Sequence, residues 1–386
     1  MTTAFGGGSG GPGAEARTWP PFQIGRAFIH PLFDYLLIGG GLSLAATAVL
    51  VGNGPLAATL ATSSWVAPLV FLSSTAHYAA STIRLYTKPG ALPALPLLTL
   101  GFPLAAAFVL ALAMLFPDSL GRSLQALYLT WLPYHYATQA FGLALMYCHR
   151  SGCPLTLGET SLLRLSCLAP FFVALLRARG AFLEWLFPVA VLAHPVFEQA
   201  RAFLAQACAV AGLILPFAFL LRPVLRRRMP LPLISLVVVL SNGVWWVTLG
   251  YGDAFVWATI FHGLQYLCVA VVFHVRERCF NSSDGHGSRY HAFRFYLLSL
   301  ALGYLLFQVW PLAGVAVGFS FAQSMLLGAA VINLHHFVVD AYIWRLRGDP
   351  NYQIVMGDAA ADVPQPGHSR GRTDFLKVSP GQGAGS

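Results

Sequence analysis

The sequence consists largely of long apolar runs, each close to the length of helix that crosses a membrane. Of the 386 residues, 57% are hydrophobic and only 10% are charged, whereas a soluble domain carries roughly 25% charged residues. A chain with so few charges cannot cover a water-facing surface, so most of its surface must face lipid. We therefore predict an all-α integral membrane protein that forms a polytopic helical bundle.

About 20 apolar residues of helix are needed to cross the hydrocarbon core of a bilayer. The sequence offers about ten such stretches, and we expect each to form a transmembrane helix. A further apolar stretch, 181–197, is interrupted by Glu184, Pro188 and Pro195, so we expect a re-entrant or interfacial segment there. The ten predicted spans are 33–52, 58–83, 93–116, 121–148, 161–177, 201–221, 231–250, 254–275, 293–310 and 313–344.

The two ends of the chain differ in composition from the part between them. The start is rich in glycine and lacks the apolar core of a secretory signal peptide. The end is rich in Gly, Pro and Ser, which is typical of a disordered segment. We divide the chain into a flexible or interfacial N-terminal segment at 1–30, a transmembrane helical domain at 31–347 and a disordered cytoplasmic tail at 348–386.

The formal net charge of +9 is interpreted as a topology signal. Lys and Arg follow the second, fourth, sixth, eighth and tenth predicted spans, and the links after the first, third, seventh and ninth have almost none. Because cytoplasmic loops carry the excess of Lys and Arg, we predict that both termini are cytoplasmic. We expect the protein to lie in a lipid bilayer, taken to be the bacterial inner (plasma) membrane, and to bind no nucleic acid.

Four of the predicted spans carry a histidine well inside the membrane. In the predicted topology these spans, the second, fourth, eighth and tenth, all run in the same direction. Their histidines lie roughly 7 to 15 residues before the cytoplasmic basic flank, about 10 to 22 Å deep. Ionisable groups inside lipid are costly and tend to mark function, and the depths overlap enough that tilted helices could bring these histidines together. The four residues are His77, His135, His262 and His336.

Polar residues accompany each histidine. Residues three or four positions apart share one face of a helix, so His336 and Asp340 lie on one stripe, whereas His335 points about 100° away. Tyr266 follows His262 by four positions. The other polar neighbours are Ser74, Ser81 and Arg84 around His77, Gln139 after His135, Gln265 after His262, and Asn333 before His336.

Converging imidazoles in a dry medium favour metal binding. Neutral imidazole suits iron, copper and zinc, and ligation satisfies ring nitrogens that would otherwise be unpaired in hydrocarbon. We expect a metal ion, with iron favoured and copper or haem as alternatives. Tyr266 and Arg84 are candidate catalytic residues, and Gln139, Gln265 and Asn333 are expected to support the ligands. The candidate ligands are His77, His135, His262, His335, His336 and Asp340.

This layout is similar in kind to that of the histidine-rich membrane oxygenases and desaturases, which bind iron within a helical bundle. The histidine boxes that define the desaturases are absent, so no residue role is carried over from them. The leading hypothesis is a membrane-embedded metal-dependent oxidoreductase that acts on a lipid or other apolar small molecule, with an electron-donor protein as a further partner.

Two other hypotheses use the same residues. The polar stripes could line the path of a proton, an ion or a small solute in a transporter or channel. Alternatively, the histidines could act as hydrogen-bonding links between helices in a non-catalytic membrane subunit or assembly factor. The metal content of the purified protein separates these hypotheses from the first.

Overall fold

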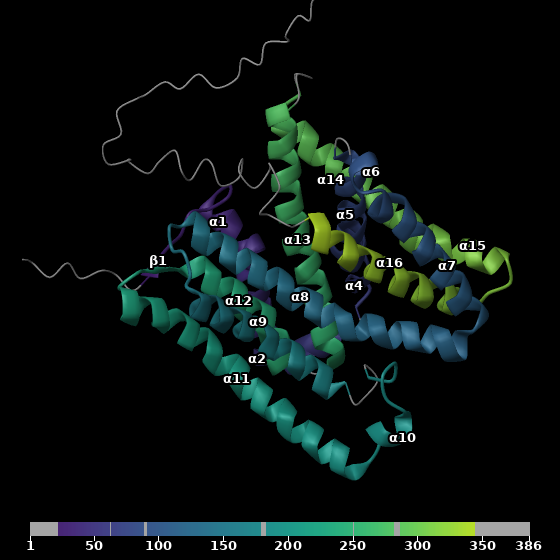
Figure 1. The fold of residues 1–386 in the computed structure, drawn as a ribbon, viewed down its shortest axis with the longest axis horizontal. Coiled ribbons are helices and arrows are strands. Elements are labelled where there is room, and N and C mark those ends of the chain that lie inside the picture. Colours follow the sequence, from purple (N-terminus) through teal and green to yellow (C-terminus); the bar gives the residue numbers. More distant parts are fainter. Residues whose placement is uncertain are drawn as a thin grey trace, which may run out of the picture.

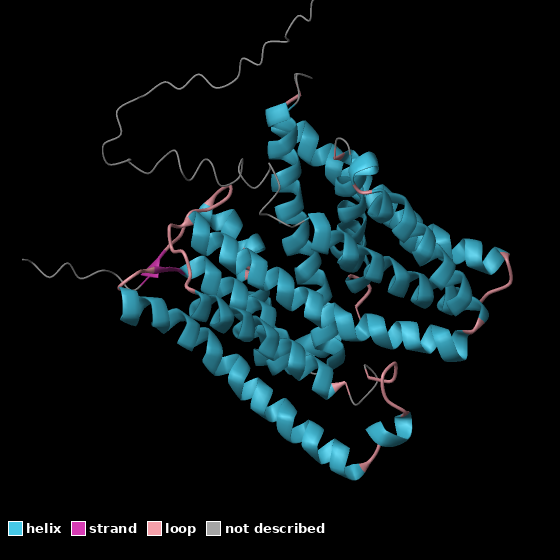
Figure 2. Cartoon of the chain, viewed as in Figure 1, coloured by secondary structure: helices cyan, strands magenta, loops and turns pink. Residues whose placement is uncertain are grey.

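The computed structural model describes residues 22–61, 63–88, 91–178, 183–249, 251–281 and 286–343. Almost all of these residues are helical (Figure 2), so the all-α prediction is confirmed. Within them the only sheet is a short parallel pair of strands, β1 (Phe22–Gln23) and β2 (Leu231–Pro232). Residues 1–21 of the predicted N-terminal segment and the predicted tail at 348–386 lie outside the described residues.

The helices range from single turns to the 33 residues of α11. Five π-helical segments, in which the backbone is locally wider, occur at Asp34–Ile38, Phe71–Thr75, Leu97–Gly101, Pro117–Gly121 and Leu305–Val309. In chain order the α-helices are α1 (Pro31–Phe33), α2 (Gly41–Gly52), α3 (Gly54–Ala61), α4 (Val66–Val70), α5 (Ala76–Thr87), α6 (Ala91–Ala94), α7 (Phe102–Leu115), α8 (Arg122–Arg150), α9 (Leu157–Arg177), α10 (Val189–Leu192), α11 (Pro195–Arg227), α12 (Leu233–Thr248), α13 (Tyr251–Asn281), α14 (Ser288–Tyr304), α15 (Trp310–Ala316) and α16 (Phe321–Ile343).

Six helices are long and apolar enough to cross a membrane, which indicates a membrane protein. A seventh span results if Pro31–Ile38 and Gly41–Gly52, which are bent by 50° at Gly40, cross together. Gly40 has a φ of +81°, in the left-handed region that favours glycine. The predicted count of about ten spans is not confirmed, and the cytoplasmic location of the termini stays a prediction. The six are Leu97–Leu115, Leu157–Arg177, Pro195–Arg227, Gly252–Cys279, Ser288–Ala316 and Phe321–Ile343.

Three other predicted spans are helical without being among these six. The helix α12 is apolar but has only 16 residues. The helix α8 has 29 residues, and α4, a π-helical segment and α5 form a continuous helical run over 66–87. These two stretches are long enough, but the polar residues around His135 and His77 lower their mean hydropathy. Two of the four helices that carry the cluster histidines, α5 and α8, therefore fall outside the six, whereas the other two, α13 and α16, are among them.

The boundary between the last two predicted spans lies later in the chain than expected. The predicted link near 310–313 is helical, because Pro311 occupies the first turn of α15, where a missing N–H costs no hydrogen bond. The turn instead contains Gly318, whose φ is +99°. In the predicted re-entrant or interfacial segment 181–197, the described residues form turns, α10 and the start of α11. Its placement in a membrane stays a prediction.

The helices pack in two groups that meet at α13 (Figure 1). In one group α9 lies along α11, and α12 packs against α8, α9 and α2. In the other group α5 packs against α14, and α16 packs against α7 and α15. The helix α13 contacts α12 in the first group and both α5 and α14 in the second, while α16 bridges from α5 to α8. The helices α5, α8, α13 and α16 therefore meet at the centre of the molecule.

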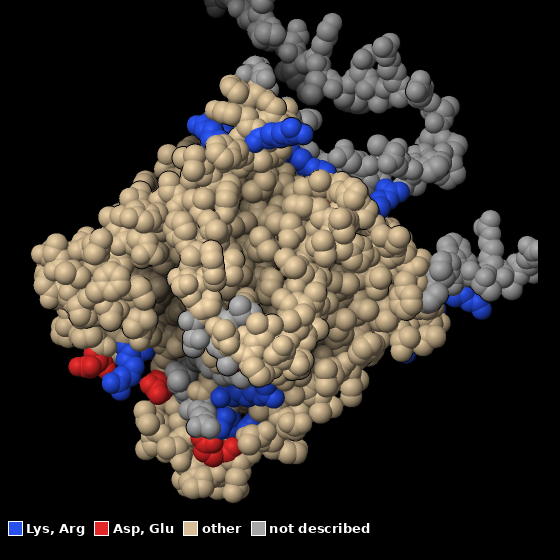
Figure 3. Space-filling model, turned by 180° about the vertical axis from the view of Figure 1, so that it is seen from behind, with Lys and Arg blue, Asp and Glu red and all other residues tan. Residues whose placement is uncertain are grey.

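Charged residues avoid most of the surface seen in Figure 3. On that face Lys and Arg gather near the upper end, charges of both signs gather near the lower end, and the broad surface between them is largely uncharged. Exposed apolar side chains of the long helices contribute to such surfaces, for example Phe108 on α7 and Phe203 on α11. This distribution fits a bundle whose middle part is surrounded by hydrocarbon.

Candidate metal centre

Four buried histidines from four helices converge at the centre of the bundle. His77 comes from α5, His135 from α8, His262 from α13 and His336 from α16. The centroid of the His77 ring lies 5.1 Å from that of His262 and 4.7 Å from that of His336. The His135 ring lies 5.1 and 5.0 Å from the same two rings. The four imidazoles predicted from the sequence therefore form one closed cluster.

The fold places each histidine well inside its helix. His135 lies near the middle of the 29 residues of α8. His77 lies near the middle of the helical run 66–87 and two residues after the end of the π-helical segment Phe71–Thr75. Such widened turns are uncommon and are frequently found at functional sites.

The Nε2 atoms of all four imidazoles are buried, and none has a hydrogen-bond partner among the described residues. The exposed fraction of these side chains is between 0% and 7%. A buried polar atom without a partner costs roughly 1–3 kcal/mol, so four would cost roughly 4–12 kcal/mol. That sum is comparable with the whole stability of a typical protein, about 5–15 kcal/mol. Buried nitrogens in this state, on neighbouring rings, make the cluster a candidate site for a bound cation.

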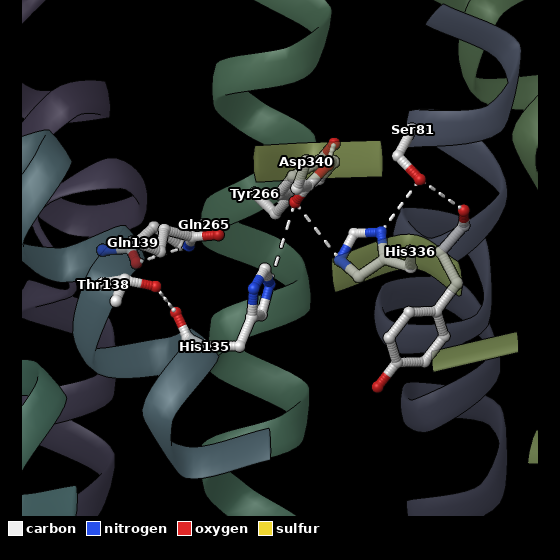
Figure 4. Close-up of polar contacts among 9 residues, drawn as sticks. Ser81, His135, Thr138, Gln139, Gln265, Tyr266, His336 and Asp340 are labelled. Carbon is white, nitrogen blue, oxygen red and sulfur yellow. Dashed lines mark hydrogen bonds and ion pairs between the residues drawn. The ribbon is translucent and has the colours of Figure 1, made fainter. Parts of the chain in front are cut away.

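The hydrogen bonds of His336 determine which of its nitrogens carries the proton. The Ser81 hydroxyl donates its single proton to the Tyr78 carbonyl oxygen at 2.9 Å. Ser81 Oγ lies 2.8 Å from Nδ1 of His336, and with its proton already used it can only accept (Figure 4). With the Ser81 proton on the Tyr78 carbonyl oxygen, Nδ1 is assigned the proton and Nε2 presents a lone pair to the cluster. A fixed tautomer of this kind is the usual support of a metal-ligating histidine.

Asp340 faces the same point from the next turn of α16. Its Oδ1 accepts a hydrogen bond of 2.7 Å from the Tyr266 hydroxyl. Its Oδ2 lies 3.3 Å from Nε2 of His336 and 3.7 Å from Nε2 of His135 (Figure 4). Because Nε2 of His336 and Oδ2 of Asp340 both present lone pairs, the pair requires a cation, either a proton or a metal ion.

The spacing of these atoms suits metal coordination. Two sets of three potential ligand atoms lie within 4.8 Å of one another, one formed by His77, His262 and His336 and the other by His135, His336 and Asp340. Ligands bound at about 2.0–2.2 Å lie roughly 2.8–3.6 Å apart, which includes the 3.3 Å between His336 and Asp340. His336 belongs to both sets and is the central ligand candidate.

Three of the predicted site residues make their contacts elsewhere. His335 is not in either ligand set, because its ring points away from His336 and stacks on Phe102 at 5.2 Å. Arg84 reaches α13, where it donates to the Ala270 carbonyl oxygen and lies over an aromatic ring. Asn333 donates from its amide nitrogen to a carbonyl oxygen of its own helix. His335 therefore lies apart from the other candidate ligands, and its ligand role stays a prediction.

The two predicted glutamines form a pair beside the cluster. Nε2 of Gln139 donates to Oε1 of Gln265 at 2.9 Å, which links α8 to α13 (Figure 4). Gln265 in turn donates to the Ile38 carbonyl oxygen at 2.5 Å. This chain of amides positions the two histidine-bearing helices without contacting a ligand nitrogen.

Three residues that surround the histidines had no role predicted from the sequence. The Tyr136 ring stacks on His262 with the centroids 3.9 Å apart, and the Tyr78 ring lies 3.9 Å from the His77 ring. Ser81 fixes the tautomer of His336. Tyr78 and Tyr136 each follow a cluster histidine directly in the sequence, so that adjacency was the available signal.

A cavity of about 470 Å³ adjoins the cluster and is lined in part by His135, Tyr266 and Asp340. Most of its other lining residues are apolar. Its volume lies in the range of about 300–1,000 Å³ that is usual for small-molecule sites. The histidine cluster thus borders a space that could hold an apolar ligand. Comparison of the chain with protein-family models, with curated proteins and with solved structures gives no match.

Proposed function

We propose that this protein is a membrane-embedded metal-dependent oxidoreductase that acts on a lipid or other apolar substrate in the bacterial inner membrane. One observation carries the proposal: four buried histidines from four helices form one cluster, and none of their Nε2 atoms has a hydrogen-bond partner within the described part of the chain. Helix-to-helix hydrogen bonding accounts for Nδ1 of His336, which contacts Ser81 on α5, but it does not account for the four Nε2 atoms, because such a bond would give each of them a partner.

The ligand set favours non-haem iron. His135, His336 and Asp340 provide the two histidines and one carboxylate that hold iron in many oxygen-using enzymes, with positions left open for other ligands. His77 and His262 offer further nitrogens next to the same ion. Copper is the alternative for a set dominated by imidazole. Haem is less suitable, because four rings 4.7 to 5.1 Å apart leave no room between them for a macrocycle.

The metal would supply the redox chemistry, which protein side chains alone do not provide. In this proposal dioxygen is the oxidant and an electron-donor protein is the reductant. The residues of the chain position the reactants. Tyr266 holds Asp340 through its hydroxyl and also lines the cavity, so its proton lies at the boundary between the metal centre and the substrate space. Arg84 is not placed in the reaction.

The decisive experiment is metal analysis with a visible absorption spectrum on the detergent-purified protein, and we expect about one iron per chain. His336→Ala should remove the metal, because this residue belongs to both ligand sets. The matched control is His335→Ala, the same substitution one position earlier, where the ring stacks on Phe102. Size-exclusion chromatography shows whether each variant is folded.

Three outcomes would refute the proposal. A folded wild-type protein that stays free of metal after growth and reconstitution in iron or copper would favour a transporter or channel, with His336 and Asp340 as a proton-coupled pair. Equal metal retention by the His336→Ala and His335→Ala variants would show that the metal lies elsewhere. If both variants instead lost their fold and no metal were bound, the histidines would be structural links of a non-catalytic subunit.

A further inference from the structure

The cavity beside the metal centre follows one face of α8. Its lining residues on this helix include Trp131, His135, Gly142 and Met146, which recur at the three- and four-residue steps of one helical face. From Trp131 to Met146 the helix rises about 22 Å. The cavity is therefore elongated rather than round, and its long direction follows α8.

The polar groups of the cavity gather at one level. The polar lining residues lie at about the level of one turn of α8. They are His135 and Gln139 on that helix, together with Tyr266 and Asp340 from the neighbouring helices. Toward Met146 the lining becomes apolar, with residues such as Leu143 and Val269. A ligand that fills this space therefore meets polar groups at one place along its length and apolar groups beyond it.

The rim of the cavity lies in the middle turns of α8. Trp131 and Tyr134 on α8 are 37% and 42% exposed, and both line the cavity. These residues are distant along the helix from Arg122 at its start and Arg150 at its end. In a bilayer this rim faces hydrocarbon, so a ligand would enter from the side.

The described lining of the cavity offers no basic side chain to an acidic ligand. Neither Lys nor Arg lines the cavity within the described part of the chain, and Asp340 is its only acidic residue there. A carboxylate or phosphate inside the cavity would lie near the Asp340 carboxylate without a basic partner. A neutral group, such as a hydroxyl or carbonyl, can instead exchange hydrogen bonds with the side chain of Gln139.

We propose that the cavity binds a neutral, single-chain lipid, with the chain extended along α8 from the metal centre past Gly142 to Met146. This inference rests on the proposed function for the chemistry at the metal, but the binding of the chain can be measured without turnover. Gly142 keeps the path open, because a Cβ atom added there would meet no other atom within 4 Å. A larger side chain at this position would enter the cavity without displacing a neighbour.

The experiment is photolabelling of the protein in lipid nanodiscs with octadecanol that carries a diazirine in its chain. We expect adducts on the cavity residues of α8 and α13, and competition by unlabelled octadecanol. Gly142→Phe should reduce labelling by about tenfold or more, because the ring occupies the path of the chain. The matched control is Gly252→Phe on α13, an exposed position with no atom within 4 Å of an added Cβ. Octadecanoate with the same diazirine should label the wild type less than the alcohol does.

Labelling that is equal in Gly142→Phe and in the wild type, or adducts that map outside the cavity, would overturn the proposal. Equal labelling by the acid and the alcohol would overturn its restriction to neutral lipids. Metal analysis of the same samples separates this proposal from the proposed function. If a protein without metal were labelled in a manner that depends on Gly142, the result would support the lipid-binding cavity and refute the proposed oxidoreductase function. If a metal-containing protein were labelled equally with and without the Gly142 substitution, the result would refute the lipid-binding cavity and leave the proposed oxidoreductase function supported.

Discussion

Replacing Ser81 with alanine tests whether the tautomer of His336 supports a metal ligand. Ser81 does not belong to either ligand set, so the substitution removes no atom that binds metal. It removes the oxygen that accepts the Nδ1 proton of His336 at 2.8 Å. The imidazole is then free to carry its proton on Nε2, the nitrogen that faces Asp340, and that tautomer cannot bind a metal.

The size of the effect follows from the burial of the pair. Ser81 and His336 are 0% and 1% exposed, so water cannot replace the lost oxygen, and an unpaired Nδ1–H costs roughly 1–3 kcal/mol. Loss of a partner behind a metal-bound histidine typically lowers metal affinity 10- to 100-fold, which is about 1.4–2.7 kcal/mol. We therefore expect Ser81→Ala to bind iron with a dissociation constant about 10 to 100 times that of the wild type.

The assay is competition for ferrous iron with a coloured chelator under anaerobic conditions. Ser299→Ala is the matched control, because Ser299 is equally buried but its hydroxyl donates to a carbonyl oxygen of its own helix, α14. An unchanged dissociation constant for Ser81→Ala in a folded protein would refute the reasoning about the tautomer. A loss of affinity as large in Ser299→Ala would show that removal of any buried hydroxyl loosens the bundle.

Two further substitutions test the support of the centre and of the fold. Gly263→Ala should lower iron affinity by about tenfold or more. The added Cβ would lie 2.9 Å from the carbonyl carbon of Ser73, so α13 and its histidine would have to move away from the helical run that contains α5. The control variant Gly252→Ala, which has open space around its Cβ, should bind iron as the wild type does. Asp34→Asn should destabilise the protein by roughly 3 kcal/mol and lower its melting temperature at unchanged iron content, because the buried carboxylate accepts hydrogen bonds from three backbone N–H groups and a tyrosine hydroxyl. The control variant Asp253→Asn, at an exposed position, should have no such effect. Equal melting temperatures of Asp34→Asn and the wild type would contradict this role of Asp34.

Hydropathy located the helices better than it located their ends and bends. Each of the ten predicted spans overlaps helical structure in the described part of the chain, because length and apolar content are local properties of the chain, although the count of ten spans is not confirmed. The bend at Gly40 and the continuation of the helix through Pro311 could not be read in the same way. The first depends on a left-handed glycine, and the second depends on where the preceding π-helical segment ends.

The sequence predicted which helices carry the histidines and which face of each helix they lie on, but it did not predict the contacts between side chains of different helices. Spacing along α16 placed His336 and Asp340 on one face and directed His335 elsewhere, and both expectations agree with the structure. Contacts between helices were not accessible from spacing. The bond from Ser81 to His336 joins residues 255 positions apart, and its existence depends on how α5 and α16 are rotated toward each other.

The difference in burial among the long helices explains how a polar centre can exist inside a bilayer. In the most apolar windows of the outer helices at Leu97–Leu115, Pro195–Arg227 and Ser288–Ala316, only 22%, 28% and 22% of the residues are buried. The corresponding shares for α13 and α16, which carry histidines of the cluster, are 61% and 56%. Lipid-facing helices must be apolar all round, whereas covered helices can carry polar residues if those residues find partners. The outer helices expose apolar side chains to lipid, which costs no desolvation energy. Because they cover α5, α8, α13 and α16, these inner helices can carry polar side chains that a metal ion would coordinate.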